Sequence, residues 1–409
     1  MKKEIRVRCV FVFPLLLLLV YIGAALSNVL PDRLPALMAA EESPAAAVAR
    51  AEPQPGASLD GAFREPDWIG FTVCRMLYEG LSDDGQQAYR SLYEAVLTHK
   101  EMVYIPSLSP RELSDVHAAL KYDNPHLPCV SDEFSYGSFG GLFYVKMRYD
   151  YTRAECDALS AELVSSARSL CAQCADLDDY GRELWLHDAL VRLSEYSEEG
   201  INSNTAAGVL VDRKGVCAGY ALGMKLLCDI TGIDSCVVRG TAESVRGTEA
   251  HAWLIVQIGG RWYHLDPTWD DPVNENDKNQ LTHAYFNLPT EWIGADHRDF
   301  TLPEGVTCDS TEDAYYIREG LFCGTGDWRA VIKENLAGRL SSLPFDVEFR
   351  FETGSLFDRA YESLMGGEIN EIINELLREE GFPIERWRVA SQAFNSMNSI
   401  RLIVSDYEE

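Results

Sequence analysis

Three short motifs carry a thiol, an imidazole and a carboxylate in an order that suits acyl transfer. Cys217 lies in a Gly-Val-Cys-Ala-Gly-Tyr-Ala motif, His251 opens a His-Ala-Trp motif, and Asp266 ends a Tyr-His-Leu-Asp motif. A thiolate attacks a carbonyl carbon, an imidazole moves the proton, and a carboxylate holds the imidazole in one tautomer. We therefore predict Cys217 as the nucleophile, His251 as the general base and acid, and Asp266 as the residue that orients His251.

The residues around Cys217 predict that it stands at the beginning of a helix. Lys214-Gly215 breaks the chain, and apolar residues at helical spacing follow Cys217 as far as Leu227. Unpaired N–H groups and the positive end of the helix dipole favour an anion there, so the thiol pKa should fall. A lone cysteine in an apolar helix is more often an inert core residue, but the His and Asp motifs that follow favour catalysis.

The second and third motifs predict a β-hairpin. Two apolar runs flank Gly259-Gly260, which is typical of a two-residue hairpin turn. If Ile258 pairs with Arg261, alternation places His251 and Asp266 on the same face as diagonal neighbours. We expect the Asp266 carboxylate to reach the His251 imidazole.

Together these motifs resemble those of the transglutaminase-like superfamily of thiol acyltransferases and peptidases. The resemblance runs from about residue 179 to residue 300 and includes His187-Asp-Ala-Leu190, Tyr285-Phe286 and Asp296-His297. It implies an α+β, papain-like core in which the nucleophile helix packs on an antiparallel sheet. It also implies the same three roles for Cys217, His251 and Asp266.

Ala206-Ala207 departs from the aromatic residue that bacterial relatives often carry before the nucleophile. The backbone N–H of Cys217 can serve as one oxyanion donor, and Asn204 or Tyr220 could supply a second. Trp253 and Trp269 are further candidates for the substrate site, as walls beside the nucleophile.

Composition excludes some classes of partner. The net charge of −28 leaves no evident basic patch, so we expect no nucleic acid. We predict no cofactor and no metal. Calcium at the Asp and Asn residues of 270–277 is less favoured than an exposed polar loop, because their spacing fits no defined calcium loop.

The chain contains eleven cysteines. Cys171 and Cys174 could form a four-thiolate zinc site with Cys308 and Cys323, but the chain has no second closely spaced pair. Buried thiols, or one or two disulfides, are the favoured alternatives.

The N-terminus predicts export from the cytoplasm. Residues 1–8 are basic and residues 10–26 form a nearly unbroken apolar run, as in a secretory signal. The run is also long enough to leave a retained membrane anchor open. Both alternatives put the rest of the chain outside the cytoplasm, either secreted or anchored to the outer face of the membrane, with membrane contact only through this segment.

We expect an N-terminal α/β extension and a small C-terminal α/β domain on either side of the core. Helices are predicted near Tyr89–Leu97, after the capping boxes at Ser109 and Thr152, and at 355–380 with a break at Gly366-Gly367. Strands are predicted at 141–151, at 347–351 with one buried face, and at 400–404. The expected divisions are 1–27 (signal or anchor), 28–65 (flexible linker), 66–176 (extension), 177–325 (catalytic domain) and 326–409 (C-terminal domain).

The function that fits these features is a thiol enzyme acting on amide bonds of a protein or peptide, including cell-wall peptide. We favour a peptidase or amidase over a cross-linking transglutaminase, because no binding feature for an acceptor amine is identifiable. The alternative from another class is a non-catalytic binding scaffold, which an intact set of Cys217, His251 and Asp266 disfavours.

Overall fold

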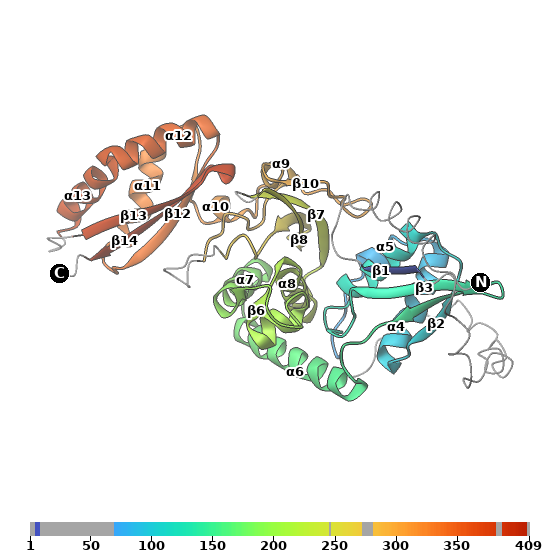
Figure 1. The fold of residues 1–409 in the computed structure, drawn as a ribbon. Helices are drawn as coiled ribbons and strands as arrows, with labels where there is room; N and C mark the ends of the chain where they lie inside the picture. The colour runs from blue at the N-terminus through green and yellow to red at the C-terminus, as the bar shows by residue number, and fades with distance from the viewer. Residues whose placement is uncertain (1–4, 9–68, 245–246, 272–280, 382–386, 407–409) are drawn as a thin grey trace, which may run out of the picture. The chain divides into compact units, whose positions relative to one another are not determined.

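The computed structural model describes residues 5–8, 69–244, 247–271, 281–381 and 387–406. Its helices and mainly antiparallel sheets form the expected mixed α+β fold (Figure 1). No helix in these ranges is long and apolar enough to cross a membrane. Apart from residues 5–8, the predicted signal or anchor segment at 1–27 and the linker at 28–65 lie outside the described residues.

The N-terminal extension contains the three helices that the sequence predicts there, and the predicted strand, which ends at Met147 rather than at residue 151. Both predicted capping boxes form: the Ser109 hydroxyl accepts from Glu112 N at 3.2 Å, and Thr152 and Glu155 pair in the same way. The elements are α3 (Met76–Glu79), α4 (Asp83–Thr98), β2 (Met102–Ile105), α5 (Pro110–Tyr122), β3 (Glu133–Phe139), β4 (Leu142–Met147), α6 (Arg153–Cys171) and η2 (Ala172–Cys174), with β1 (Ile5–Arg8) completing a sheet of order β1-β3-β4-β2.

The core places a buried helix on a four-stranded sheet of order β10-β7-β8-β9. The helix is α8 (Cys217–Thr231), which packs on β7 and β8 through a cluster that includes Leu226, Leu254 and Val256. It is buried around most of its circumference rather than along one apolar stripe. The other elements are α7 (Asp179–Leu193), β5 (Glu195–Tyr196), η3 (Gly208–Asp212), β6 (Lys214–Gly215), β7 (Ser235–Ser244), β8 (Gly247–Ile258), β9 (Arg261–Leu265), α9 (Thr290–Ile293) and β10 (His297–Arg298).

Even the charged residues of α8 are buried, because they are paired. Lys225 Nζ lies 2.6 Å from Asp229 Oδ1 and donates to the Cys74 carbonyl at 2.9 Å. Asp229 Oδ1 also accepts from Cys74 N at 3.1 Å. This ion pair joins α8 to the segment that precedes α3. A lone buried charge at this place would cost several kcal/mol.

The hairpin register is confirmed. Ile258 pairs with Arg261 and Leu254 with Leu265 across β8 and β9. Gly259 and Gly260 have φ values of 57° and 79°, which the two-residue turn requires and which glycine adopts without strain.

The C-terminal region adds a sheet of order β11-β12-β14-β13. Figure 1 shows α12 and α13 lying along one side of it, and Phe349, Ile373 and Leu402 share their apolar cluster. The predicted break falls at Gly367, with a φ of 123°. The elements are α10 (Tyr315–Arg318), β11 (Phe322–Cys323), α11 (Trp328–Ala337), β12 (Phe345–Phe351), α12 (Gly354–Ser363), η4 (Leu364–Glu368), α13 (Ile369–Glu380), β13 (Trp387–Phe394), η5 (Asn395–Met397) and β14 (Ser399–Asp406).

The prediction that the strand at 347–351 buries only one face is wrong. Glu348 and Arg350 are both 4% exposed. Glu348 accepts hydrogen bonds from His283 and from Tyr316, and the Arg350 guanidinium lies 3.9 Å from the centre of the Trp292 ring. Partners distant in the sequence therefore cover the polar face of this strand.

All ten cysteines among the described residues are free thiols. Cys171 belongs to the core cluster of α8, whereas Cys323 lies in the C-terminal cluster and Cys308 in a third. The disfavoured four-thiolate zinc site does not form there, and the favoured buried thiols are present without a disulfide.

Candidate active site

Cys217 is the first residue of α8 and is partly buried. The preceding residue, Val216, is held in extended conformation by a 2.8 Å hydrogen bond from its N–H to the Ser203 carbonyl. Gly219 is required here, because a Cβ at this position would lie 2.5 Å from the same carbonyl oxygen. The Cys-Ala-Gly motif thus lets the helix begin tightly against the 202–205 turn.

His251 and Asp266 meet across the hairpin. His251 Nε2 donates to Asp266 Oδ2 at 2.7 Å, and both side chains are buried. The second oxygen of Asp266 accepts from Thr268 N at 3.0 Å. Because Asp266 engages Nε2, the other ring nitrogen of His251 is left for its hydrogen bond with Cys217.

The electrostatics favour a thiolate–imidazolium pair. Burial raises the pKa of Cys217, but the hydrogen bond and charge of His251 and the N–H of Ala252 outweigh it, so the pKa lies below its ordinary value of 9.0. Burial lowers the pKa of His251, yet the charge and hydrogen bond of Asp266 raise it to about 10. Burial likewise opposes ionisation of Asp266, and the two neighbouring imidazoles bring its pKa below the usual range.

The other described cysteines do not share the lowered thiol pKa of Cys217. Burial raises the pKa of each of the nine remaining described thiols. A thiolate near neutral pH is therefore favoured at Cys217 alone among the described cysteines.

A second imidazole shares the Asp266 carboxylate. His297 Nε2 lies 3.1 Å from Asp266 Oδ2, and its Nδ1 lies 2.6 Å from Asp296 Oδ1. The Tyr285 hydroxyl donates to the other Asp296 oxygen at 2.7 Å. The sequence marked Tyr285, Asp296 and His297 only by family resemblance, with no role, and the structure makes them the support of Asp266.

The two tryptophan candidates occupy different positions around His251. Trp253 stacks on His251 with ring centres 5.9 Å apart, but it is 0% exposed and donates its indole N–H to His264. Trp269 is partly exposed, with its ring 5.8 Å from that of His251. The structure thus makes Trp269, and not Trp253, available as a wall facing solvent.

The candidate second oxyanion donors are both engaged elsewhere. The Asn204 side-chain amide donates to Asp132, and the buried Tyr220 hydroxyl donates to Asp271. Asn204 follows Ser203, so its backbone lies beside the start of α8. The assignment of a second donor remains a prediction.

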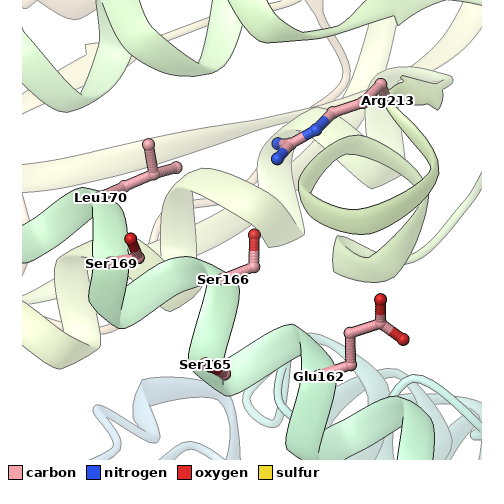
Figure 2. Close-up of a pocket in the computed structure, with 6 residues that line it drawn as sticks. All are labelled: Glu162, Ser165, Ser166, Ser169, Leu170 and Arg213. Carbon is pink, nitrogen blue, oxygen red and sulfur yellow. The ribbon is translucent and has the colours of Figure 1, made fainter.

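A hollow of about 340 Å³ lies apart from these residues, between α6 and the residue that ends η3. Figure 2 shows Arg213, the residue that follows η3, with its side chain extending toward α6. Its lining does not include Cys217, His251 or Asp266. The residues that line it are Glu162, Ser165, Ser166, Ser169, Leu170 and Arg213.

Comparison with known proteins points to the same region of the chain. Residues 147–267 match the family model of the transglutaminase-like superfamily. The kyphoscoliosis peptidase of Mus musculus is 29% identical over 85 residues, covering 19% of this chain and 13% of that protein. The Homo sapiens kyphoscoliosis peptidase is 25% identical over 115 residues, covering 25% of this chain and 17% of that protein. The chain therefore spans less than a fifth of the length of these relatives.

A solved structure described as a TGase has a TM-score of 0.26 and 13% identity, over 35% of this chain and 46% of that one. The periplasmic domain of TgpA from Pseudomonas aeruginosa, bound to ethylmercury, has a TM-score of 0.21 and 18% identity, over 31% of this chain and 55% of that one.

Proposed function

We propose that this protein, whose residues 147–267 belong to the transglutaminase-like superfamily, is a thiol enzyme that cleaves amide bonds. The observation that carries the proposal is the linked set of Cys217, His251 and Asp266, with 2.7 Å between the imidazole and the carboxylate and a thiol pKa below its ordinary value.

The reaction follows from this arrangement. The Cys217 thiolate attacks the amide carbon, and the carbonyl electrons move to the oxygen beside the start of α8. His251 gives its proton to the leaving amine, so the C–N bond breaks and a thioester forms. His251 then removes a proton from water as the water oxygen attacks the thioester carbon. The C–S bond breaks, which releases the acid and restores the Cys217 thiolate and the His251 imidazolium. Asp266 keeps the imidazole oriented and stabilises its positive charge throughout.

The aromatic residues around His251 favour hydrolysis over transfer to an amine. Transfer requires a groove that holds an amine and excludes water. Trp253 is fully buried and so cannot line such a groove, which leaves Trp269 as the partly exposed aromatic neighbour of His251. The peptidase names of the two curated relatives support the same choice.

The substrate class that we propose is a protein or peptide met outside the cytoplasm, with cell-wall peptide included. This location rests on the basic and apolar residues of the N-terminus, which are typical of a secretory signal or anchor. The strongly acidic composition of the chain suits a soluble catalytic domain rather than one that binds nucleic acid.

One experiment tests both the chemistry and the fate of the acyl group. The purified protein is incubated with a peptide library rich in glutamine, together with a labelled primary amine, and the products are read by mass spectrometry. We expect cleaved peptides, a trapped thioester on Cys217, and neither product with Cys217→Ala. Cys156→Ala, which removes another partly exposed thiol, should behave like the wild type.

Incorporation of the amine into glutamine with little cleavage would replace the peptidase assignment by transglutaminase. The absence of both products and of a thioester would favour a binding scaffold.

A further inference from the structure

A second group of histidine and carboxylate side chains lies outside the thiol site. His283 Nε2 lies 3.0 Å from Asp188 Oδ1, and His187 Nδ1 lies 3.3 Å from the same oxygen. The side chain of His187 is fully buried, that of His283 is 10% exposed and that of Asp188 is 19% exposed. Three potential ligand atoms thus converge, all within 4.8 Å of one another, and one of them belongs to the Asp188 carboxylate, which solvent can reach.

The spacing of these atoms is close to that of a coordination shell. Ligands bound tetrahedrally to Zn²⁺ at about 2.0–2.1 Å are roughly 3.3 Å apart. Both imidazole nitrogens already lie at 3.0 and 3.3 Å from Asp188 Oδ1. Arg192, one turn further along α7, lies 3.2 Å from the other oxygen, Oδ2, and so keeps Oδ1 directed at the two rings.

In each ring, the outer nitrogen, which is the one that does not face Asp188, faces a carboxylate from another element. His283 Nδ1 lies 3.0 Å from Glu348 Oε1 on β12, and His187 Nε2 lies 3.2 Å from Asp270 Oδ2 in the segment after β9. A carboxylate on the far nitrogen is the usual support of a metal-binding histidine, because it fixes the tautomer and orients the ring.

These supporting carboxylates are themselves fixed. The second oxygen of Glu348 accepts from the His283 backbone N–H at 3.0 Å and from the Tyr316 hydroxyl at 3.1 Å. The second oxygen of Asp270 accepts from Tyr285 N at 3.0 Å and from the Thr282 hydroxyl at 3.1 Å. The carboxylates of the outer shell are therefore held in place, with Glu348 bonded to its histidine and Asp270 Oδ2 3.2 Å from His187 Nε2 without a hydrogen bond between them.

We propose, in place of the sequence-based expectation of no metal, that His187, Asp188 and His283 bind one divalent transition-metal ion of the zinc class. Two imidazole nitrogens and one carboxylate oxygen suit Zn²⁺ or Co²⁺, whereas Ca²⁺ and Mg²⁺ prefer oxygen ligands alone. Water or Asp188 Oδ2 completes the shell.

The ion has a structural role at the junction of three segments. It joins α7 to the segment carrying His283 and, through Glu348, to the C-terminal sheet. Asp270 also connects the site to the catalytic hairpin, because its N–H donates to the Asp266 carbonyl at 3.3 Å. The proposal does not depend on the thiol chemistry.

The group His251, Asp266 and His297 is the natural comparison, since its ligand atoms also converge. There His251 has its second nitrogen engaged with Cys217, and all three residues are buried. This group belongs to the thiol site already described.

The test is a titration of the metal-free full-length chain carrying Cys217→Ala, which removes the reactive thiol as a competing ligand. Zn²⁺ binding is measured by calorimetry, and Co²⁺ binding by its visible absorption. We expect one ion per chain. At a free concentration of 100 times Kd, the ion should raise the melting temperature by roughly 5 °C.

Four further substitutions, each made in the Cys217→Ala protein, test which residues bind the ion. His283→Gln and Asp188→Asn should abolish stoichiometric binding, and Glu348→Gln should weaken it by about 10–100-fold, as expected for a supporting carboxylate. His297→Gln should leave it unchanged. Near-UV circular dichroism of each metal-free variant shows whether it is folded, and Asp188→Asn keeps the shape of the side chain if His283→Gln does not fold.

Three outcomes would overturn the proposal. These are no stoichiometric binding by the Cys217→Ala protein, binding that survives in folded Asp188→Asn or His283→Gln protein, and binding that His297→Gln removes. Each would leave the group as a hydrogen-bonded network that holds no metal.

Discussion

Two groups in this molecule, one buried and one partly open to solvent, use the same unit of one carboxylate oxygen between two imidazoles in different ways. Asp266 Oδ2 lies 2.7 and 3.1 Å from His251 and His297, and Asp188 Oδ1 lies 3.0 and 3.3 Å from His283 and His187. They differ in what faces the outer nitrogens of the rings. In the first group one ring faces a thiol, whereas in the second both rings face carboxylates.

This difference determines the chemistry that each group can perform. An imidazole between a carboxylate and a thiol can carry a proton to and from a reacting group. An imidazole between two carboxylates has no reacting partner and is held rigidly, which suits a ligand or a structural link. We therefore expect equivalent substitutions in the two groups to affect different properties.

The largest expected effect is on catalysis, from removing the charge of Asp266. Asp266→Asn should keep the fold but lower the rate of amide cleavage by about 10⁴-fold, since the imidazole loses its orienting charge. The matched change Asp188→Asn should leave the rate within about threefold. Steady-state kinetics on both variants measure this, and equal losses of rate would show that the two groups act as one.

The next effect is on stability, from the second group. Glu348→Ala leaves His283 and Tyr316 without their buried partner and should lower the free energy of unfolding by about 3–5 kcal/mol. Glu362→Ala, an exposed glutamate on α12, should change it by less than about 0.5 kcal/mol. Urea denaturation of both variants gives the comparison. A small effect of Glu348→Ala would mean that this junction is not held by the carboxylate.

A smaller catalytic effect is expected at His297, which we infer to be a positioning residue. His297→Gln removes a charge-assisted hydrogen bond to Asp266, worth about 1.5–3 kcal/mol, so kcat should fall roughly 10–100-fold with KM little changed. The pH profile distinguishes this role from a loss of folded protein, because loss of folding would scale the whole profile without moving its limbs. An unchanged kcat would limit the role of His297 to packing.

How much of the fold and the site is predictable from the sequence depends on the distance between partners along the chain. The hairpin register and the helix beginning at Cys217 follow from local signals, namely Gly259-Gly260, Lys214-Gly215 and the spacing of apolar residues. The pairing of His251 with Asp266 is predictable for the same reason, because both residues belong to one hairpin.

The group of His187, Asp188 and His283 is not predictable in this way. These residues and their supporting carboxylates come from α7, from the segments after β9 and from β12. Glu348 alternates with apolar residues, a pattern typical of an exposed position, yet His283 and Tyr316 cover it. The strand β13 also lacks a clear sequence signal, because its burial is only partial along its length. Long-range pairing of polar groups leaves no periodic signal in the sequence.

We infer that Cys217 exists as a thiolate paired with the His251 imidazolium. The rate at which iodoacetamide alkylates Cys217, followed as a function of pH, is the decisive measurement. The pKa of Cys217 lies below 9.0 and that of His251 is about 10, so the ion pair persists in the interval between them. We expect fast, selective labelling of Cys217 near neutral pH, which Cys217→Ala should abolish and Asp266→Asn should slow. Labelling of Cys217 with a midpoint at or above pH 9, at the same rate as other thiols, would contradict this inference.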